Sequence, residues 1–190
     1  MPVPRLSAID STLLVVDVQD RLLAAMPDAA GLIRDIAFLL DVAKLLAIPA
    51  MATEQYPQGL GPTAAALAQR LPSDRPAKTA FSCCGAPGLL ADLRRAGRPN
   101  VVVVGMESHV CVMQTVLDVL AAGLNVFVPV DAVQARFLID HHTALQRMDK
   151  AGAVLTTVET TAYEWLGGAD HPQFKPVSLL VRARMKDVRG

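Results

Sequence analysis

Hydrophobic residues in this chain form two alternating patterns: short unbroken apolar runs, and longer segments in which apolar residues recur every three or four positions. The short runs are typical of strands buried on both faces, and the longer segments have the period of an amphipathic helix. Six strands are predicted, over residues 12–18, 50–53, 76–81, 101–104, 124–130 and 153–156, with helices over 30–48, 63–70, 89–96, 141–151 and 160–166 and another that begins at Ser108. This alternation predicts an α/β fold of three layers: a doubly wound, six-stranded parallel sheet with helices on both faces.

The centre of the pattern is the segment NVVVVGMESHVCV, residues 100–112. Its four valines predict the central strand, Gly105 ends it, and Ser108 is placed to cap the following helix. Cys111 then falls in the first turn of that helix, where free amide groups and the helix dipole favour a thiolate and can hold an oxyanion. The alternative is that Cys111 only packs, because cysteine behaves as a small buried hydrophobe.

The composition narrows the class of protein. The length of 190 residues predicts one domain, 1–190, whose last segment, about 170–190, packs on the domain or on a neighbouring subunit. Eighteen basic and eighteen acidic residues cancel, so no nucleic-acid or membrane partner is expected. An odd number of cysteines and the lack of a recognisable secretory leader predict a cytoplasmic protein. The balanced charge instead favours a small molecule or another copy of the chain as the partner. The chain is 52% hydrophobic but only 4% aromatic, and this aliphatic surplus predicts apolar surface buried between the subunits of a homo-oligomer, a dimer or higher.

Three residues of complementary chemistry, Asp17, Lys78 and Cys111, lie at or just after the ends of the predicted first, third and fourth strands. The carboxyl ends of parallel strands meet at one edge of a sheet, where ligands bind in this class of fold. A thiol nucleophile needs a base for its proton and a cation near the resulting charge, and these side chains supply both. The alternatives are that Asp17 caps a turn and that Lys78 is a solvated surface charge.

Four segments, LLVVDVQD, KTAFS, VVVGMESHVCV and VPVDAV, resemble the isochorismatase-like cysteine hydrolase superfamily and follow its order along the chain. The third segment most resembles the branch of isochorismatase domain-containing proteins. By this resemblance, Asp17, Lys78 and Cys111 match the family's catalytic triad, and the strand order is 3-2-1-4-5-6. The resemblance also implies a cis peptide bond between Met106 and Glu107, and an oxyanion hole made by the backbone N–H groups of Glu107 and Cys111.

The resemblance implies a cysteine-dependent hydrolase that cleaves a small amide, ureide or related acyl substrate through a thioester intermediate. Two alternatives stay open: an ether hydrolase like the true isochorismatases, which do not require a cysteine nucleophile, and a non-catalytic oligomeric scaffold that retains the fold. A nucleotide-binding protein is disfavoured, because the turn DVQDRL after the first strand contains no glycine. Tyr56, Phe81 and Glu107 are predicted to line the substrate pocket, although the two aromatic residues fit a core almost as well.

Neither a metal nor another cofactor is predicted. Nicotinamidases of the superfamily bind a metal through histidines after the second strand, whereas residues 53–57 of this chain read TEQYP. His109 lies two residues before Cys111, so it should point away from the thiol and either pack or cap. His141 and His142 are far in the sequence from other ligand types and are predicted to be structural. The adjacent Cys83 and Cys84 suggest redox chemistry, but neighbouring residues of a strand point to opposite faces and seldom form a disulfide, so both are predicted to pack.

Overall fold

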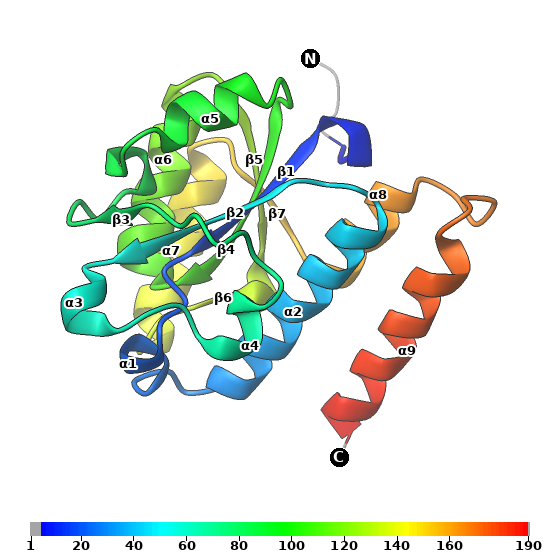
Figure 1. Ribbon diagram of the computed structural model, residues 1–190, viewed down its shortest axis with the longest axis horizontal. Coiled ribbons are helices and arrows are strands. Elements are labelled where there is room, and N and C mark those ends of the chain that lie inside the picture. Colours follow the sequence, from blue (N-terminus) through cyan, green and yellow to red (C-terminus); the bar gives the residue numbers. More distant parts are fainter. Residues whose placement is uncertain (1–4, 190) are drawn as a thin grey trace.

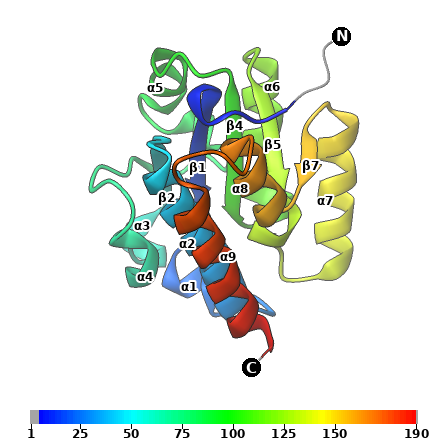
Figure 2. The ribbon, with the colours of Figure 1, turned by 90° about the vertical axis from the view of Figure 1, so that its right-hand side faces the viewer.

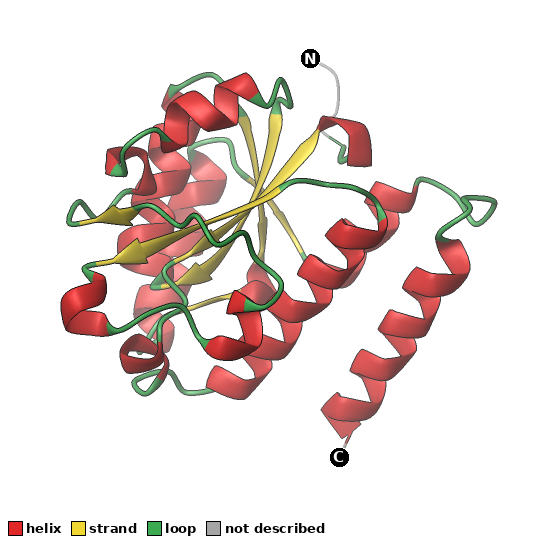
Figure 3. Cartoon of the chain, in the orientation of Figure 1, coloured by secondary structure: helices red, strands yellow, loops and turns green. Residues whose placement is uncertain are grey.

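A parallel β-sheet forms the middle of the molecule (Figure 1). The structure is a computed structural model that describes residues 5–189, with side chains as far as residue 185. The path across the sheet is β3-β2-β1-β4-β5-β7, every pair of neighbours is parallel, and the short β6 adds to the end of β4 (Figure 3). The strands are β1 (Ser11–Val16), β2 (Ala50–Gln55), β3 (Ala77–Lys78), β4 (Asn100–Met106), β5 (Asn125–Pro129), β6 (Val133–Gln134) and β7 (Val154–Thr156).

Helices connect the strands and cover both faces of the sheet (Figure 2). They are α1 (Asp20–Leu23), α2 (Ala29–Leu45), α3 (Pro57–Leu60), α4 (Ala65–Ala68), α5 (Leu89–Arg95), α6 (Met113–Ala121), α7 (Leu138–Lys150), α8 (Val158–Leu166) and α9 (Phe174–Arg189). The predicted three-layer α/β class is confirmed, and so is the strand order implied by the family resemblance, with β7 as the predicted sixth strand. The two-residue β6 is an addition to the predicted set.

The two faces of β1 pack against different sets of helices. Leu13 and Val15 belong to the core beneath α2 and α8, whereas Leu14 and Val16 belong to the core beneath α5, α6 and α7. A strand that is apolar at every position is therefore buried on both faces, as the unbroken run of hydrophobic residues predicts.

The third strand is shorter than the predicted segment 76–81, because hydrogen bonds from the Lys78 side chain to the residues that follow it turn the chain. The pairing of β3 with β2 ends at Lys78. The Lys78 ammonium donates to the carbonyl oxygens of Ala80 and Phe81, at 3.2 and 3.0 Å. These bonds curl the chain back over its own side chain. The carboxyl end of β3 is consequently folded around the lysine rather than extended along β2.

The C-terminal helix α9 lies against the outer side of α2, away from the sheet (Figures 1 and 2). Its Arg184 donates to Asp35 of α2 at 2.7 Å and to Asp131, which follows β5, at 3.1 Å. The segment therefore packs on its own chain, which was one of its two predicted positions; residues 1–4 and Gly190 of the predicted domain lie outside the described residues. No helix in the described part of the chain is long and apolar enough to cross a membrane.

Candidate active site

Asp17 follows directly after β1, and its carboxylate is fully buried at the carboxyl edge of the sheet. Its φ of +51° lies in the left-handed region, which costs a non-glycine residue about 1 kcal/mol. Lys78 Nζ lies 2.7 Å from Asp17 Oδ2, and the Thr53 hydroxyl donates to Asp17 Oδ1 at 2.8 Å. The left-handed turn thus aims a buried carboxylate at two donors from neighbouring strands.

The Lys78 ammonium is buried as deeply as the carboxylate with which it pairs. Besides Asp17, it donates to Gln55 Oε1 at 2.6 Å and to the carbonyl oxygens of Ala80 and Phe81. Four oxygen acceptors surround a group that carries three protons, so burial of the charge is compensated on every side. The structure does not place Lys78 in solvent; it places a saturated cation beside Asp17.

A turn of π-helix, Ser108–Val112, carries Cys111 beyond the end of β4 and leads into α6. Gly105 allows this turn to approach β1: it pairs with Val16, the residue before Asp17, and has a φ of +127°. A Cβ at position 105 would lie 2.2 Å from the Val16 carbonyl oxygen, so a side chain does not fit there. Glycine at this position brings the cysteine-bearing turn against the end of β1.

Burial raises the pKa of the Cys111 thiol, the negative charge of Asp17 raises it further, and the positive charge of Lys78 lowers it. All three side chains therefore act in one electrostatic environment. This direction is opposite to the expectation that the helix N-terminus favours a thiolate, because burial of the thiol is the largest cause of the shift and Asp17 adds to it. The Cys111 side chain is 3% exposed, its pKa is raised, and it lies near a carboxylate that can accept a proton.

The peptide bond between Met106 and Glu107 is trans, so the cis bond implied by the family resemblance is wrong for this structure. A trans bond is favoured by about 3 kcal/mol at a non-proline residue. The change of direction after β4 is made by Gly105 and the π-helical turn instead. Within that turn the Glu107 carbonyl accepts the N–H groups of Val110 and Val112, and the Cys111 N–H lies between these two donors.

The prediction that Ser108 caps the helix is wrong. Glu107 occupies the cap position, and its side chain makes no capping hydrogen bond. The Ser108 hydroxyl lies 3.2 Å from His141 Nδ1 instead, and burial lowers the pKa of that histidine. Neighbouring His109 has its Nε2 3.8 Å from Asp140 Oδ2. Both contacts join the cysteine-bearing turn to the start of α7, a link that the sequence analysis missed. Among the described side chains, no group of three or more His, Cys, Asp or Glu could hold a metal ion.

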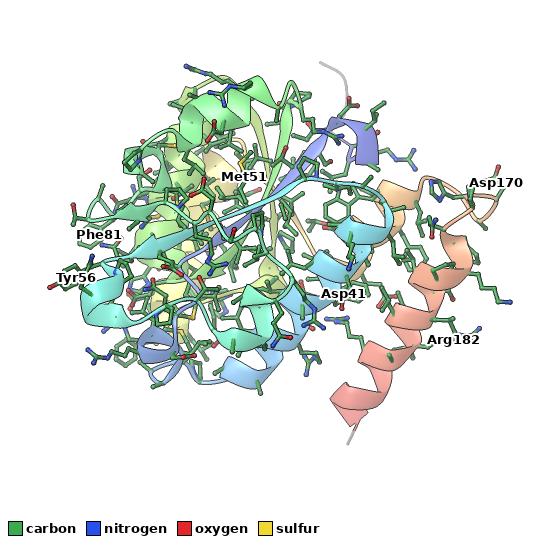
Figure 4. All side chains as sticks on the ribbon, in the orientation of Figure 1. Asp41, Met51, Tyr56, Phe81, Asp170 and Arg182 are labelled. Carbon is green, nitrogen blue, oxygen red and sulfur yellow. The ribbon has the colours of Figure 1, made fainter. Side chains whose placement is uncertain are left out.

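The three residues predicted to line the pocket all lie near the surface around the carboxyl edge. Tyr56 and Phe81 are about half exposed and project from the same end of the molecule (Figure 4), so neither is a core aromatic. Tyr56 contributes to a cavity of about 330 Å³ that Lys78 also lines. Glu107 forms an ion pair with Arg136 at 2.9 Å, and this arginine is a charged residue of the rim that the sequence analysis missed.

Two further residues that were not predicted as site residues are linked to Asp17, one directly and one through the other. Thr53 donates to Asp17, and Cys83, which was expected only to pack, lies 3.2 Å from the Thr53 hydroxyl. The position of Thr53 in the sequence could have indicated its role, because Thr53 lies near the end of the second strand, at the same edge of the sheet as Asp17. Gln19 is also fully buried and bonds Gln55 through both ends of its amide, which fixes β2 beside the turn after β1.

A doubly wound parallel sheet, with an acid, an amine and a thiol buried beyond its carboxyl edge, defines a protein with the isochorismatase-type hydrolase fold. The chain belongs to the isochorismatase family, since the family model for the isochorismatase domain matches residues 11–160. The human isochorismatase domain-containing protein 2 is 39% identical over 179 residues, which cover 93% of this chain and 85% of the human protein.

Solved structures agree with this assignment. A Caenorhabditis elegans protein described as MAR1 ribonuclease has a TM-score of 0.87 and 42% sequence identity, with 94% of this chain and 92% of that chain covered. The YcaC gene product of Escherichia coli, described as an octameric hydrolase of unknown specificity, has a TM-score of 0.91 and 26% identity, with 100% and 95% covered.

Proposed function

We propose that this protein is a cysteine-dependent hydrolase that cleaves a small amide, ureide or related acyl compound. The observation that carries the proposal is the buried ion pair between Asp17 and Lys78 beside the protonated Cys111 thiol. A carboxylate paired with a cation and placed near a thiol is the arrangement of a general base with its nucleophile. Membership of a family with a hydrolase fold agrees with this chemistry.

In the first half of the reaction, Asp17 takes the thiol proton while Cys111 Sγ forms a bond to the substrate carbonyl carbon. The carbonyl π electrons move to oxygen, and we assign the backbone N–H groups of Glu107 and Cys111 as donors to that oxyanion. Asp17 then returns the proton to the leaving nitrogen as the C–N bond breaks. Lys78 balances the negative charge of Asp17 through their ion pair. Loss of one oxyanion donor would raise the barrier by about 3 kcal/mol.

In the second half, water hydrolyses the thioester. Asp17 accepts a proton from the water as its oxygen attacks the acyl carbon, and the C–S bond then breaks. The departing sulfur recovers the proton from Asp17, which restores the starting state. The same carboxylate thus serves as base and acid twice in each turnover, which a buried ionised group with one close cation is suited to do.

The test is a screen of small amides and ureides with the wild-type protein and with Cys111→Ala. Cys111→Ala should lower turnover by a factor on the order of 10⁴ or more while the unfolding midpoint in urea is retained. Mass spectrometry of the wild type, quenched during turnover, should find the acyl group on the peptide that contains Cys111. Cys84→Ala, which removes a neighbouring thiol outside the site, is the matched control and should keep full activity. Full turnover by purified Cys111→Ala would remove Cys111 from the mechanism.

Two rival functions enter the same screen. A vinyl ether substrate tests the ether hydrolase, whose turnover would survive Cys111→Ala. RNA is included because the nematode relative is described as a ribonuclease. The equal numbers of acidic and basic residues argue against RNA, since phosphate contacts need a basic surface. A protein that turns over no compound of any class would be the non-catalytic scaffold.

We also propose that the protein is a homo-oligomer, because the related E. coli protein is described as an octamer. Three successive residues at the start of α7, Phe137, Leu138 and Ile139, are each more than 60% exposed. Consecutive exposed apolar side chains of this size are unusual on a monomer and are typical of a surface buried between subunits.

A further inference from the structure

Three buried side chains that the proposed mechanism does not use form a hydrogen-bonded chain behind the site. The Thr53 hydroxyl lies 2.8 Å from Asp17 Oδ1 and 3.2 Å from Cys83 Sγ. The backbone N–H of Cys83 donates to the Thr115 hydroxyl at 2.8 Å, and that hydroxyl donates to the Cys111 carbonyl at 2.7 Å. Each of these residues is at most 3% exposed, so the chain connects the base to the nucleophile's backbone without meeting solvent.

The donor and the acceptor of each hydrogen bond in this network follow from how many hydrogen bonds each group can donate and accept. The Asp17 carboxylate, which is paired with Lys78, can only accept, so the single hydroxyl proton of Thr53 is directed to Asp17. The Thr53 oxygen is then free to accept, and the Cys83 S–H is its donor. Burial raises the pKa of the Cys83 thiol to about 12, with the charge of Asp17 as the next cause, so this thiol retains its proton at neutral pH.

The members of this chain come from three different elements. Thr53 belongs to β2, Cys83 begins the short 3-10 helix Cys83–Gly85, and Thr115 belongs to α6. Cys83 is the junction, because its side chain contacts Thr53 and its backbone contacts Thr115. A cysteine that only fills space in the core needs no hydrogen bond at its thiol, whereas Cys83 is hydrogen-bonded at both its thiol and its backbone N–H.

We propose that Thr53 and Cys83 are positioning residues for the general base: the Thr53 hydroxyl donates to the Asp17 carboxylate and holds it in place, and the Cys83 thiol fixes the Thr53 hydroxyl in its donating orientation. This inference rests on the proposed function, because it assigns partners to the base of that reaction. A hydrogen bond to the charged form of a carboxyl group favours that form. Removal of the Thr53 hydroxyl therefore takes away one of the two side-chain hydrogen bonds to the Asp17 carboxylate.

The experiment measures the rate at which iodoacetamide alkylates Cys111 as a function of pH, followed on the Cys111 peptide by mass spectrometry. This readout needs no substrate, and the thiol reacts once its proton can pass to Asp17. In Thr53→Val the acid limb of the pH–rate profile should move to higher pH by about one unit, the effect of losing one hydrogen bond to a charged group. Cys83→Ala should move it in the same direction by less, and Thr53→Ser, which keeps the hydroxyl, should restore the wild-type limb.

Two control variants separate this role from general damage to the core. Thr12→Val removes a buried hydroxyl on the neighbouring strand that has no hydrogen-bond partner among the described residues. Cys84→Ala removes the thiol adjacent to Cys83 in the chain. Both should leave the acid limb in place. When a substrate is known, the kcat profile should show the same shifts while KM stays within about twofold.

The possible results are distinct. A reactive Cys111 whose acid limb is unchanged in both Thr53→Val and Cys83→Ala overturns this inference and leaves the proposed function standing. An equal fall in rate at every pH, without movement of the limb, shows a structural role only and also overturns it. A wild-type Cys111 that iodoacetamide never labels, together with no Cys111-dependent turnover, overturns the proposed function and this inference with it.

Discussion

Lys78 is the residue on which the stability and the proposed chemistry of the site both depend. Its ammonium and the Asp17 carboxylate are fully buried and 2.7 Å apart. Removing one member of such a pair leaves the other charge buried without a partner, which costs far more than the net contribution of the intact pair. The site is thus built so that neither member can be replaced alone.

Lys78→Met should therefore lower the free energy of unfolding by about 3–5 kcal/mol and abolish turnover. Urea unfolding at neutral pH measures the first effect. The double variant Lys78→Met with Asp17→Asn, which removes both charges, should recover much of the stability but no activity. Lys44→Met, an exposed lysine of α2, is the control and should change stability by less than about 0.5 kcal/mol. A Lys78→Met protein as stable as the wild type would show that the fold does not depend on this buried ion pair.

At the scale of elements, the cysteine-bearing turn is placed by the close packing of β4 on β1. Gly105 combines a φ of +127° with direct contact to the Val16 backbone, so both its conformation and its lack of a side chain are required. Gly97 offers the matched comparison, because its φ is +65° but a Cβ there would meet nothing within 4 Å.

Gly105→Ala should destabilise the protein by about 4 kcal/mol, because backbone strain and overpacking add. Gly97→Ala should cost only the strain of its left-handed conformation, about 1 kcal/mol. Urea unfolding of the two variants gives the comparison. Because residue 105 leads into the turn with Cys111, iodoacetamide labelling of any folded Gly105→Ala protein should also differ from the wild type. Equal stability of the two variants would contradict the role assigned to the β1–β4 contact.

The strands and the α/β class could be predicted from the sequence because apolar runs and their alternation with helices are local signals, whereas the order of the strands came from the family resemblance. The same logic places Asp17 and Cys111 at strand ends. The π-helical turn has no such signal, because it depends on the contact of Gly105 with Val16 and on the bonds from the turn to α7. The pKa direction of Cys111 could not be predicted either, because it depends on how deeply the finished fold buries the thiol.

Glu54, on β2, ties this strand to the segment that follows it. Burial would raise its pKa, but hydrogen bonds from the Thr63 N–H and hydroxyl and the charge and hydrogen bond of Arg75 outweigh burial, so the pKa is lowered from 4.5. A carboxyl group with a lowered folded pKa stabilises the fold above its unfolded pKa and loses this contribution as the pH falls through the folded pKa.

Glu54→Gln should therefore reduce stability at neutral pH by about 1–2 kcal/mol and flatten the loss of stability below pH 4.5. Urea midpoints measured at a series of pH values give both quantities. Asp74→Asn, at an exposed position of the same segment, should run parallel to the wild type at every pH. Parallel curves for Glu54→Gln and the wild type would show that the carboxylate has the same pKa in the folded and unfolded chains.

At the scale of the whole molecule, the exposed residues Phe137, Leu138 and Ile139 connect the proposed assembly to the proposed site. They are flanked by Arg136, which pairs with Glu107, and by Asp140, whose carboxylate lies 3.8 Å from His109. Both partners belong to the segment that carries Cys111. A surface buried between subunits at this position would hold that segment from outside.

Leu138→Glu should therefore dissociate the homo-oligomer, because a carboxylate placed inside an apolar interface loses its hydration without gaining a partner. Leu138 is 71% exposed in the single chain, so the substitution should leave the unfolding midpoint of the monomer unchanged. Light scattering after size-exclusion chromatography measures the mass. Leu179→Glu, on the exposed face of α9, is the control, since Leu179 is 56% exposed and lies far along the chain from α7. A wild-type protein that is monomeric would refute the assembly, whereas dissociation by Leu179→Glu alone would place the interface on α9.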